Sequence, residues 1–98
     1  MRVRHRDDGE YEKWVKSIEQ REFSKVARRL LLLSDLGRLL GMPTVRRIDG
    51  EVSEVRSGKY RLYFTLTESE AIFLAYGEKD TQQRDIERAR QRAKEFQA

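Results

Sequence analysis

The chain has 98 residues, of which 39% are charged and 38% are hydrophobic, and its formal net charge is +4. This length fits one domain, residues 1–98, with a modest core. The absence of cysteine excludes disulfides and argues against a zinc site, so we expect neither a metal nor a cofactor. No apolar run approaches the roughly 20 residues of a membrane helix, and residues 1–6 lack the apolar stretch of a secretory signal. We therefore expect a cytoplasmic protein without a membrane partner, and the basic balance favours nucleic acid or an acidic protein as partner.

The first half of the chain predicts a short strand followed by two amphipathic helices. Residues 1–6 are the candidate edge strand. The first helix has one apolar face, formed by Tyr11, Trp14, Val15 and Ile18. The second helix begins near Arg21 or Glu22 and is expected to end at Gly41, ahead of Pro43. Its apolar stripe consists of Phe23, Val26, Ala27, Leu30, Leu31 and Leu33. Matching stripes on neighbouring helices indicate a helical hairpin.

After Pro43 the hydrophobic period changes from helical to alternating, which predicts strands. We expect strands over residues 44–48, 51–56, 59–66 and 71–76, with tight turns between the first three. A third helix is expected at the end of the chain, over residues 82–96. Two helices followed by a run of strands indicate the α+β class. We therefore predict two N-terminal helices packed on an antiparallel four-stranded sheet, with a C-terminal helix.

The strand over residues 59–66 separates apolar from polar side chains. Its apolar face is expected to meet the helices, and consists of Tyr60, Leu62, Phe64 and Leu66. If Val55 of the preceding strand also joins the core, the opposite face carries three cations, a phenol and a carboxylate. These residues are Arg56, Lys59, Arg61, Tyr63 and Glu54. We expect this second face to be solvent-exposed, with Arg47 and Lys79 at its border.

Such a face is a candidate phosphodiester site. Arginine offers phosphate a bidentate fork, lysine a point charge, and tyrosine a stacking surface or a proton. The alternative is an ordinary solvated sheet face, because antiparallel sheets often expose one face to water.

Other residue types give weaker signals. His5, the single histidine, is expected to be solvated, and Asp7 and Asp8 are expected to cap the first helix rather than bind a metal. One histidine and no cysteine leave no nucleophilic triad to assemble. The basic residues of the third helix alternate with acids, which predicts an exposed, ion-paired face, with a nucleic-acid role as the alternative. These residues are Arg84, Arg88, Arg90 and Arg92.

Three segments of the chain resemble toxins of the RelE/ParE superfamily. Residues 54–56 (Glu-Val-Arg) and 58–64 (Gly-Lys-Tyr-Arg-Leu-Tyr-Phe) resemble the ELR and GxYRxxY core of this superfamily. Residues 76–86 are similar to the GGDKSxQxxDI segment of the addiction-module killer proteins, close to the HigB-like branch. Residues 11–14 are similar to the FxxWL start of the same group. The resemblance covers about residues 1–97 and implies a RelE-like fold and the toxin component of a type II toxin–antitoxin system.

The resemblance also implies partners and a target. A cognate antitoxin would neutralise the toxin in a toxin–antitoxin hetero-oligomer. The RelE and HigB branches cut mRNA on the ribosome without a metal, which implies an endoribonuclease that binds mRNA and the ribosome. The ParE branch instead inhibits DNA gyrase without nuclease activity, so a gyrase inhibitor is the first alternative and an inactive binding module is the second.

The expected site follows from these segments by position. Arg61 matches the arginine of the YR motif, and Arg56 matches the arginine of the preceding strand. The catalytic group is expected to comprise Arg61, Arg56, Tyr63 and Glu54. The RNA-binding group is expected to comprise Lys59, Arg47, Lys79 and Arg84.

In the expected mechanism Arg56 and Arg61 hold the scissile phosphate, a lysine adds positive charge nearby, and Glu54 or Tyr63 transfers a proton. The sequence departs from the family at Val52 and Glu54, where RelE has lysines, and it has no match for the catalytic histidines of HigB.

Overall fold

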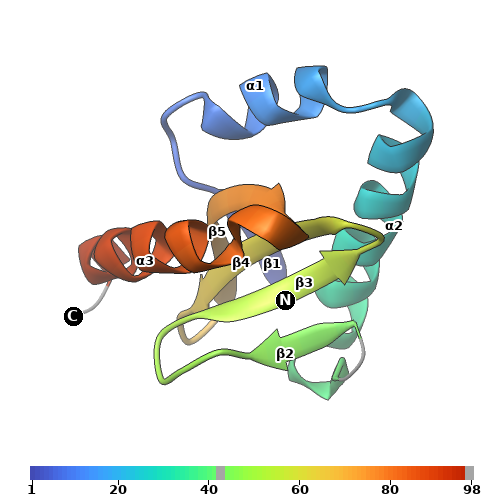
Figure 1. The fold of residues 1–98 in the computed structure, drawn as a ribbon. Coiled ribbons are helices and arrows are strands. Elements are labelled where there is room, and N and C mark those ends of the chain that lie inside the picture. The colour runs from blue at the N-terminus through green and yellow to red at the C-terminus, as the bar shows by residue number, and fades with distance from the viewer. Residues whose placement is uncertain (42–43, 97–98) are drawn as a thin grey trace.

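The structure is a computed structural model that describes residues 1–41 and 44–96. Within these residues the helices are α1 (Glu10–Ser17), α2 (Gln20–Leu36) and α3 (Gln82–Ala93). The strands are β1 (Arg2–His5), β2 (Val45–Arg47), β3 (Ser53–Ser57), β4 (Tyr60–Leu66) and β5 (Glu70–Glu78). Three short 3₁₀ turns complete the fold: η1 (Gly37–Leu39), η2 (Lys79–Thr81) and η3 (Lys94–Phe96). Figure 1 shows these elements in place.

The strands form one mixed sheet in the order β1-β5-β4-β3-β2. The strands β2 to β5 pair antiparallel with their neighbours, whereas β1 pairs parallel with β5. The α+β class is confirmed. The prediction of four antiparallel strands is wrong in detail, because the N-terminal strand adds a fifth, parallel member. Its partner lies more than 60 residues away, with Val3 opposite Ala71, and such a long-range pairing is not visible in local sequence patterns.

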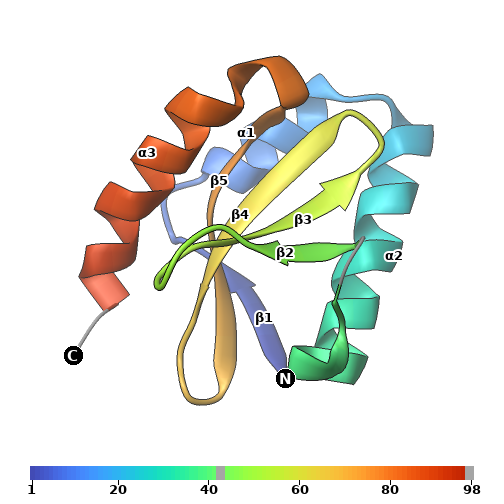
Figure 2. The same cartoon turned by 60° about the horizontal axis from the view of Figure 1, so that its bottom comes forward.

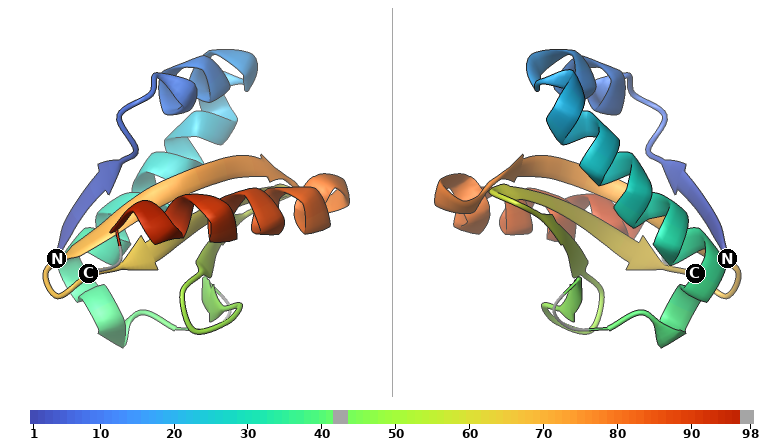
Figure 3. Two further views of the ribbon diagram at one scale, coloured as in Figure 1. Left: turned by 90° about the vertical axis from the view of Figure 1, so that its left-hand side faces the viewer. Right: turned by 90° about the vertical axis from the view of Figure 1, so that its right-hand side faces the viewer.

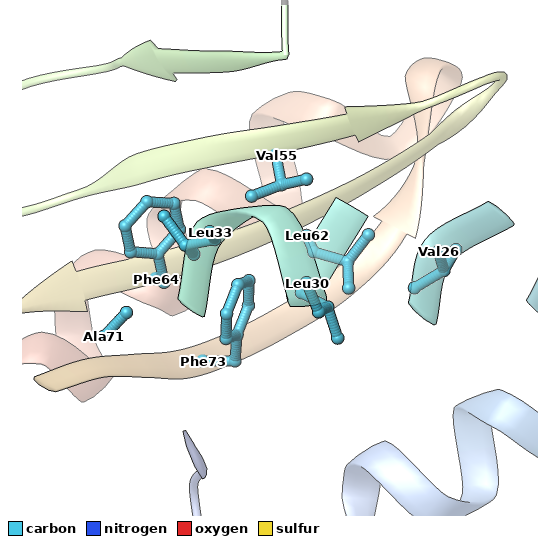
Figure 4. Close-up of a cluster of buried hydrophobic side chains, with 8 residues drawn as sticks. All are labelled: Val26, Leu30, Leu33, Val55, Leu62, Phe64, Ala71 and Phe73. Carbon is cyan, nitrogen blue, oxygen red and sulfur yellow. The ribbon is translucent and has the colours of Figure 1, made fainter. Parts of the chain in front are cut away.

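One face of the sheet packs on α2 and forms the first core cluster. Leucines and a valine of the helix meet alternate residues of β3, β4 and β5 (Figure 4). The cluster consists of Val26, Leu30, Leu33, Val55, Leu62, Phe64, Ala71 and Phe73. Val55 is completely buried, which meets the condition set by the alternation of β3, and this fixes which face of β3 its neighbours occupy.

The opposite face of the sheet is covered by α3, which lies across the sheet from α2 (Figures 2 and 3). A second apolar cluster joins the helix to the strands, and consists of Val52, Tyr63, Ile72, Leu74, Ala75, Ala89 and Ala93. The expectation that this face is solvent-exposed is therefore wrong at its centre, where Tyr63 and Glu54 are both 0% exposed, while Arg56 and Lys59 remain accessible. The physical reason lies in β5, whose residues 71–75 are apolar on both faces, a pattern typical of a strand buried from both sides.

Two local predictions also need correction. The helix α2 ends at Leu36, where Gly37 adopts a positive φ of 55°, and not at Gly41; Pro43 lies outside the described residues. His5 is half-buried rather than solvated. Its ring stacks on Tyr11 with centroids 3.5 Å apart, its Nδ1 lies 2.7 Å from the Tyr76 hydroxyl, and burial lowers the pKa of its imidazole to about 4.

The helix α1 begins after Gly9, and the Asp8 carboxylate accepts the backbone N–H of Glu10 at 2.9 Å. In the described part of the chain, no helix has the length and apolar character needed to cross a membrane.

Candidate nucleic-acid site

The sheet register brings the predicted site residues to one face, beneath the start of α3. Arg46 of β2 lies opposite Glu54 of β3, which in turn lies opposite Tyr63 of β4. Two residues further along β3, Arg56 lies opposite Arg61 of β4. These five side chains share the face that α3 covers, because alternate residues of a strand point to the same side.

Glu54 forms the centre of this group. Its carboxylate is fully buried and accepts hydrogen bonds from Arg56 Nε at 2.8 Å and Gln82 Nε2 at 3.0 Å. Arg46 Nε lies 3.5 Å from the same Oε1 that Arg56 contacts. A buried carboxylate is tolerated only when it is paired and hydrogen-bonded, and these three donors from β2, β3 and α3 meet that need. Glu54 therefore fixes two guanidinium groups in place, with neither of its oxygens left free.

Arg61 and Tyr63 lie beneath this layer. Arg61 is 8% exposed, and its Nη1 donates to the carbonyl oxygens of Gly58 at 2.8 Å and Tyr60 at 2.9 Å. Within the described residues, Arg61 Nε and the Tyr63 hydroxyl have no hydrogen-bond partner. Burial raises the pKa of the Tyr63 phenol well above its ordinary value, and the nearby Glu54 carboxylate adds to the effect. Tyr63 thus stays protonated at neutral pH and cannot serve as a base.

The segment over residues 76–86 anchors the start of α3. Thr81 Oγ1 donates to Asp85 Oδ2 at 2.6 Å, and Asp85 is 1% exposed. A Cβ on Gly77 would overlap this carboxylate oxygen, so the close packing of β5 against α3 requires glycine there. The glycine, threonine and aspartate of this segment therefore have a structural explanation: together they position Gln82 over Glu54.

The four cations expected to bind RNA differ in their neighbours: two lie beside a carboxylate, and two have no ion pair among the described residues. Lys59 is exposed and pairs with Glu78 at 3.2 Å, a hydrogen bond that raises the pKa of its ammonium. Arg84 is exposed and lies 3.6 Å from Asp85. Arg47 points to the other face of β2 and donates to the carbonyl oxygen of Asp49 at 3.1 Å, so it does not join the group around Glu54. Lys79 is exposed in η2, where it borders a hollow that it shares with Arg46.

The remaining arginines of α3 make ion pairs, as the charge pattern predicted. Their partners lie mostly on other elements, so the pairs attach α3 to α1 and to the β2–β3 turn. The pairs are Arg88–Glu10 at 3.8 Å, Arg92–Glu10 at 2.8 Å, Arg90–Asp49 at 2.6 Å and Arg90–Glu87 at 3.4 Å. In the described ranges, no group of three or more His, Asp or Glu side chains could hold a metal ion.

The sequence reasoning missed three residues of the site: Arg46, Gln82 and Asp85. The predicted RNA-binding group contains Arg47 in place of its neighbour Arg46. Because successive residues of a strand point to opposite faces, this shift of one residue puts the cation on the wrong side of the sheet. The alternation could have identified it, because Val45 pairs with Val55 in the core and Arg46 must then face the other way. Gln82 and Asp85 belong to residues 76–86, which resemble a segment of the addiction-module killer proteins. Their contacts could not be predicted from that resemblance, because they depend on where α3 packs.

The site thus combines solvent-facing guanidinium groups with a buried carboxylate that orients them. The side chains of Arg46 and Arg56 are 42% and 34% exposed, so both can reach an anion from solvent while they remain attached to Glu54. Planar guanidinium forks of this kind suit phosphate.

The family model described as phage-derived protein Gp49-like (DUF891) matches residues 13–94, which is most of the chain. No curated protein matches the chain. The Gp49-like family consists of RelE-like toxins associated with toxin–antitoxin modules, a toxin role that fits the α+β fold and the guanidinium site. The chain belongs to the Gp49-like family of addiction-module toxins.

Proposed function

We propose that this protein is the toxin of a type II toxin–antitoxin system, in the HigB-like group, and acts as a metal-independent, ribosome-dependent mRNA endoribonuclease. The observation that carries the proposal is the pair of solvent-facing guanidinium groups, Arg46 and Arg56, held on the buried carboxylate of Glu54. Family membership supports the toxin role. Messenger RNA and the ribosome, as target and partner, are part of the proposal.

The proposed reaction uses the RNA's own 2′-hydroxyl as nucleophile. Its oxygen attacks the adjacent phosphorus, the bond from phosphorus to the 5′-oxygen breaks, and the products are a 2′,3′-cyclic phosphate and a 5′-hydroxyl. One proton leaves the 2′-oxygen and one reaches the 5′-oxygen. Negative charge grows on the non-bridging phosphate oxygens in between, and Arg56 and Arg46 stabilise that charge.

Burial and hydrogen bonding support different roles for the other residues from those expected. Glu54 is fully buried with both oxygens occupied, so we assign it to orientation of the guanidinium groups rather than proton transfer. Tyr63 keeps its proton and serves as a buried support. Arg61 acts from beneath, where it holds the β3–β4 turn through Gly58 and Tyr60. Both protons of the reaction then pass through solvent or through groups of the ribosome.

The test is tightly controlled expression in bacteria with mapping of RNA 5′ ends. The proposal expects new cuts within translated messages from the parent protein and from Arg47→Met. It expects none from Arg46→Met combined with Arg56→Met. The Arg47→Met variant is the matched control, because Arg47 neighbours Arg46 but lies on the opposite face of β2. Growth arrest with intact messages would contradict the nuclease proposal.

The burial of Arg61 and Tyr63 favours a second candidate, a gyrase inhibitor without nuclease activity. Of the residues that resemble the RelE core, Arg61 and Tyr63 are buried, at 8% and 0% exposure, whereas Arg56 and Lys59 reach solvent. For this candidate, toxin expression would leave messages intact and cause DNA damage.

We also propose that a cognate antitoxin covers the exposed face of α2. Three leucines of α2 and one of the following turn η1 are exposed: Leu31 at 62%, Leu32 at 36%, Leu36 at 43% and Leu39 at 87%. The preceding turns of the helix expose Arg21, Lys25 and Arg28, and the described residues offer these cations only one ion pair, from Lys25 to Glu22 at 3.7 Å. A face that is basic at one end and apolar at the other is complementary to an amphipathic helix with acidic residues.

The docking proposal is tested with the cognate antitoxin, once it is identified by its ability to neutralise the toxin. Leu39→Lys should weaken its binding by roughly tenfold or more, since a lysine would be placed in an apolar contact. Gln91→Lys, which adds the same charge on the exposed side of α3, should leave binding unchanged. Equal affinity of both variants would show that the antitoxin binds elsewhere.

A further inference from the structure

A hollow of about 450 Å³ adjoins the guanidinium site, between β2, η2 and the first turn of α3. Its lining consists of Arg46, Lys79, Asp80, Gln82, Gln83 and Ile86. The hollow is shallow and wide open to solvent, so a ligand there would lie against the surface. Three separate elements build it, and Gln82 is fixed in its wall by the hydrogen bond to buried Glu54.

The charges in the hollow favour an anion. Arg46 shares the Glu54 Oε1 atom with Arg56 and is the more distant of the two, at 3.5 Å against 2.8 Å. Lys79 has no ion pair among the described residues, and Asp80 is the single carboxylate in the lining. Arg46 and Lys79 therefore leave the hollow with net positive charge and with N–H donors available to a phosphate group.

The other lining groups suit more than a bare phosphate. Gln83 is exposed and has no hydrogen bond to the described residues, while Gln82 donates to Glu54 and keeps its carbonyl oxygen free. A carboxamide presents a donor and an acceptor together, which matches the edge of a nucleobase. Asp80 can accept from an amino or hydroxyl group, and half-buried Ile86 offers an apolar contact. A free phosphate could accept from the Gln83 amide, but it would not use the apolar contact with Ile86 or the acceptor oxygen of Gln82.

We propose that this hollow binds one nucleotide of an RNA strand, with its phosphate on Arg46 and Lys79 and its base against Gln83 and Ile86. The inference rests on the proposed function, since the phosphate on Arg46 and Lys79 is the scissile phosphate that Arg56 also contacts. It assigns a role in substrate selection to Gln83, Lys79 and Ile86, which lie outside the catalytic group expected from the sequence.

The test is direct binding, which needs neither a ribosome nor cleavage. Each of the four nucleoside 3′-monophosphates, and inorganic phosphate alone, is titrated into the ¹⁵N-labelled protein. Amide shifts are followed by NMR, and dissociation constants are obtained from them. At least one nucleotide should shift the amides of residues 79–86 and bind at least tenfold more tightly than inorganic phosphate. Arg46→Met and Lys79→Met should each weaken that binding by roughly tenfold or more, because each removes a charge-assisted hydrogen bond.

Two controls keep the test specific. Arg47→Met removes a cation from the other face of β2, and Lys94→Met removes an exposed cation from η3 at the far end of α3; both should bind as the parent does. Thermal midpoints of all four variants establish that they fold. Nucleotide binding that is lost only in Arg46→Met and Lys79→Met supports the inference even if no message is cut in cells, in which case the proposed function alone fails. Equal binding of phosphate and nucleotides, equal binding by Arg46→Met and Arg47→Met, or no binding at all would overturn it.

Discussion

Replacement of Glu54 probes the buried carboxylate on which the guanidinium site depends. Glu54→Ala removes the acceptor for Arg56, Arg46 and Gln82. Breaking a buried ion pair costs about 3–5 kcal/mol. Here the two arginine side chains are 34% and 42% exposed and regain water, so we expect a loss of about 2–4 kcal/mol in the free energy of unfolding. For a domain of this size the corresponding fall in thermal midpoint is roughly 10–20 °C.

The assay is urea unfolding, followed by circular dichroism and by the fluorescence of Trp14. A double-mutant cycle with Glu54→Gln and Arg56→Met isolates the pair, and we expect a coupling energy of about 1 kcal/mol. Arg47→Met serves as the control for removing an arginine from a neighbouring strand. A Glu54→Ala protein within about 0.5 kcal/mol of the parent, or a coupling energy of zero, would refute the reasoning.

The same substitution separates orientation from proton transfer. If Glu54 only orients Arg46 and Arg56, Glu54→Gln slows RNA cleavage but leaves the shape of the pH–rate profile unchanged. If Glu54 were the general base, its loss would remove the acidic limb of that profile.

Three further outcomes follow from the buried groups. Gly77→Ala should lower the free energy of unfolding by roughly 1–3 kcal/mol, because the new methyl group overlaps Asp85. Gly50→Ala is the control and should have little effect, because the space around Gly50 is open. Equal unfolding free energies for the two variants would contradict the packing argument. Tyr63→Phe should leave the free energy of unfolding unchanged or raise it, because it removes a buried hydroxyl without a partner, and it should leave cleavage intact; a loss of cleavage in a stable variant would restore a catalytic role for this phenol. The folded-state pKa of His5 lies at about 4, below the ordinary value of 6.5, so burial of the neutral ring stabilises the protein above pH 6.5. That contribution declines as the pH falls towards 4. His5→Phe should therefore flatten the dependence of unfolding free energy on pH in this window, and an unchanged slope would argue against a buried neutral imidazole.

The local patterns of the sequence predicted most of the elements and their apolar faces. The period-two alternation over residues 59–66 correctly assigned Leu62 and Phe64 to the α2 face, and the same alternation placed Arg61 and Tyr63 on the other. Helical spacing located α1 to α3 with errors of a few residues, mainly at the C-terminal end of α2. These features depend on neighbours along the chain, so one sequence suffices to predict them.

What only the tertiary structure decided is whether a polar face meets water, and which residues of distant segments meet there. Alternation tells which side of β4 carries Tyr63, but its complete burial depends on α3, which begins 19 residues downstream. Arg46, and not Arg47, lies beside Glu54 because of the register in which β2 pairs with β3. That register is defined only when the two strands pair. Glu54 acquires its role from Gln82 in the same way. Burial and long-range pairing are properties of the packed chain, because each depends on free energy that several elements contribute together, and no single segment encodes them.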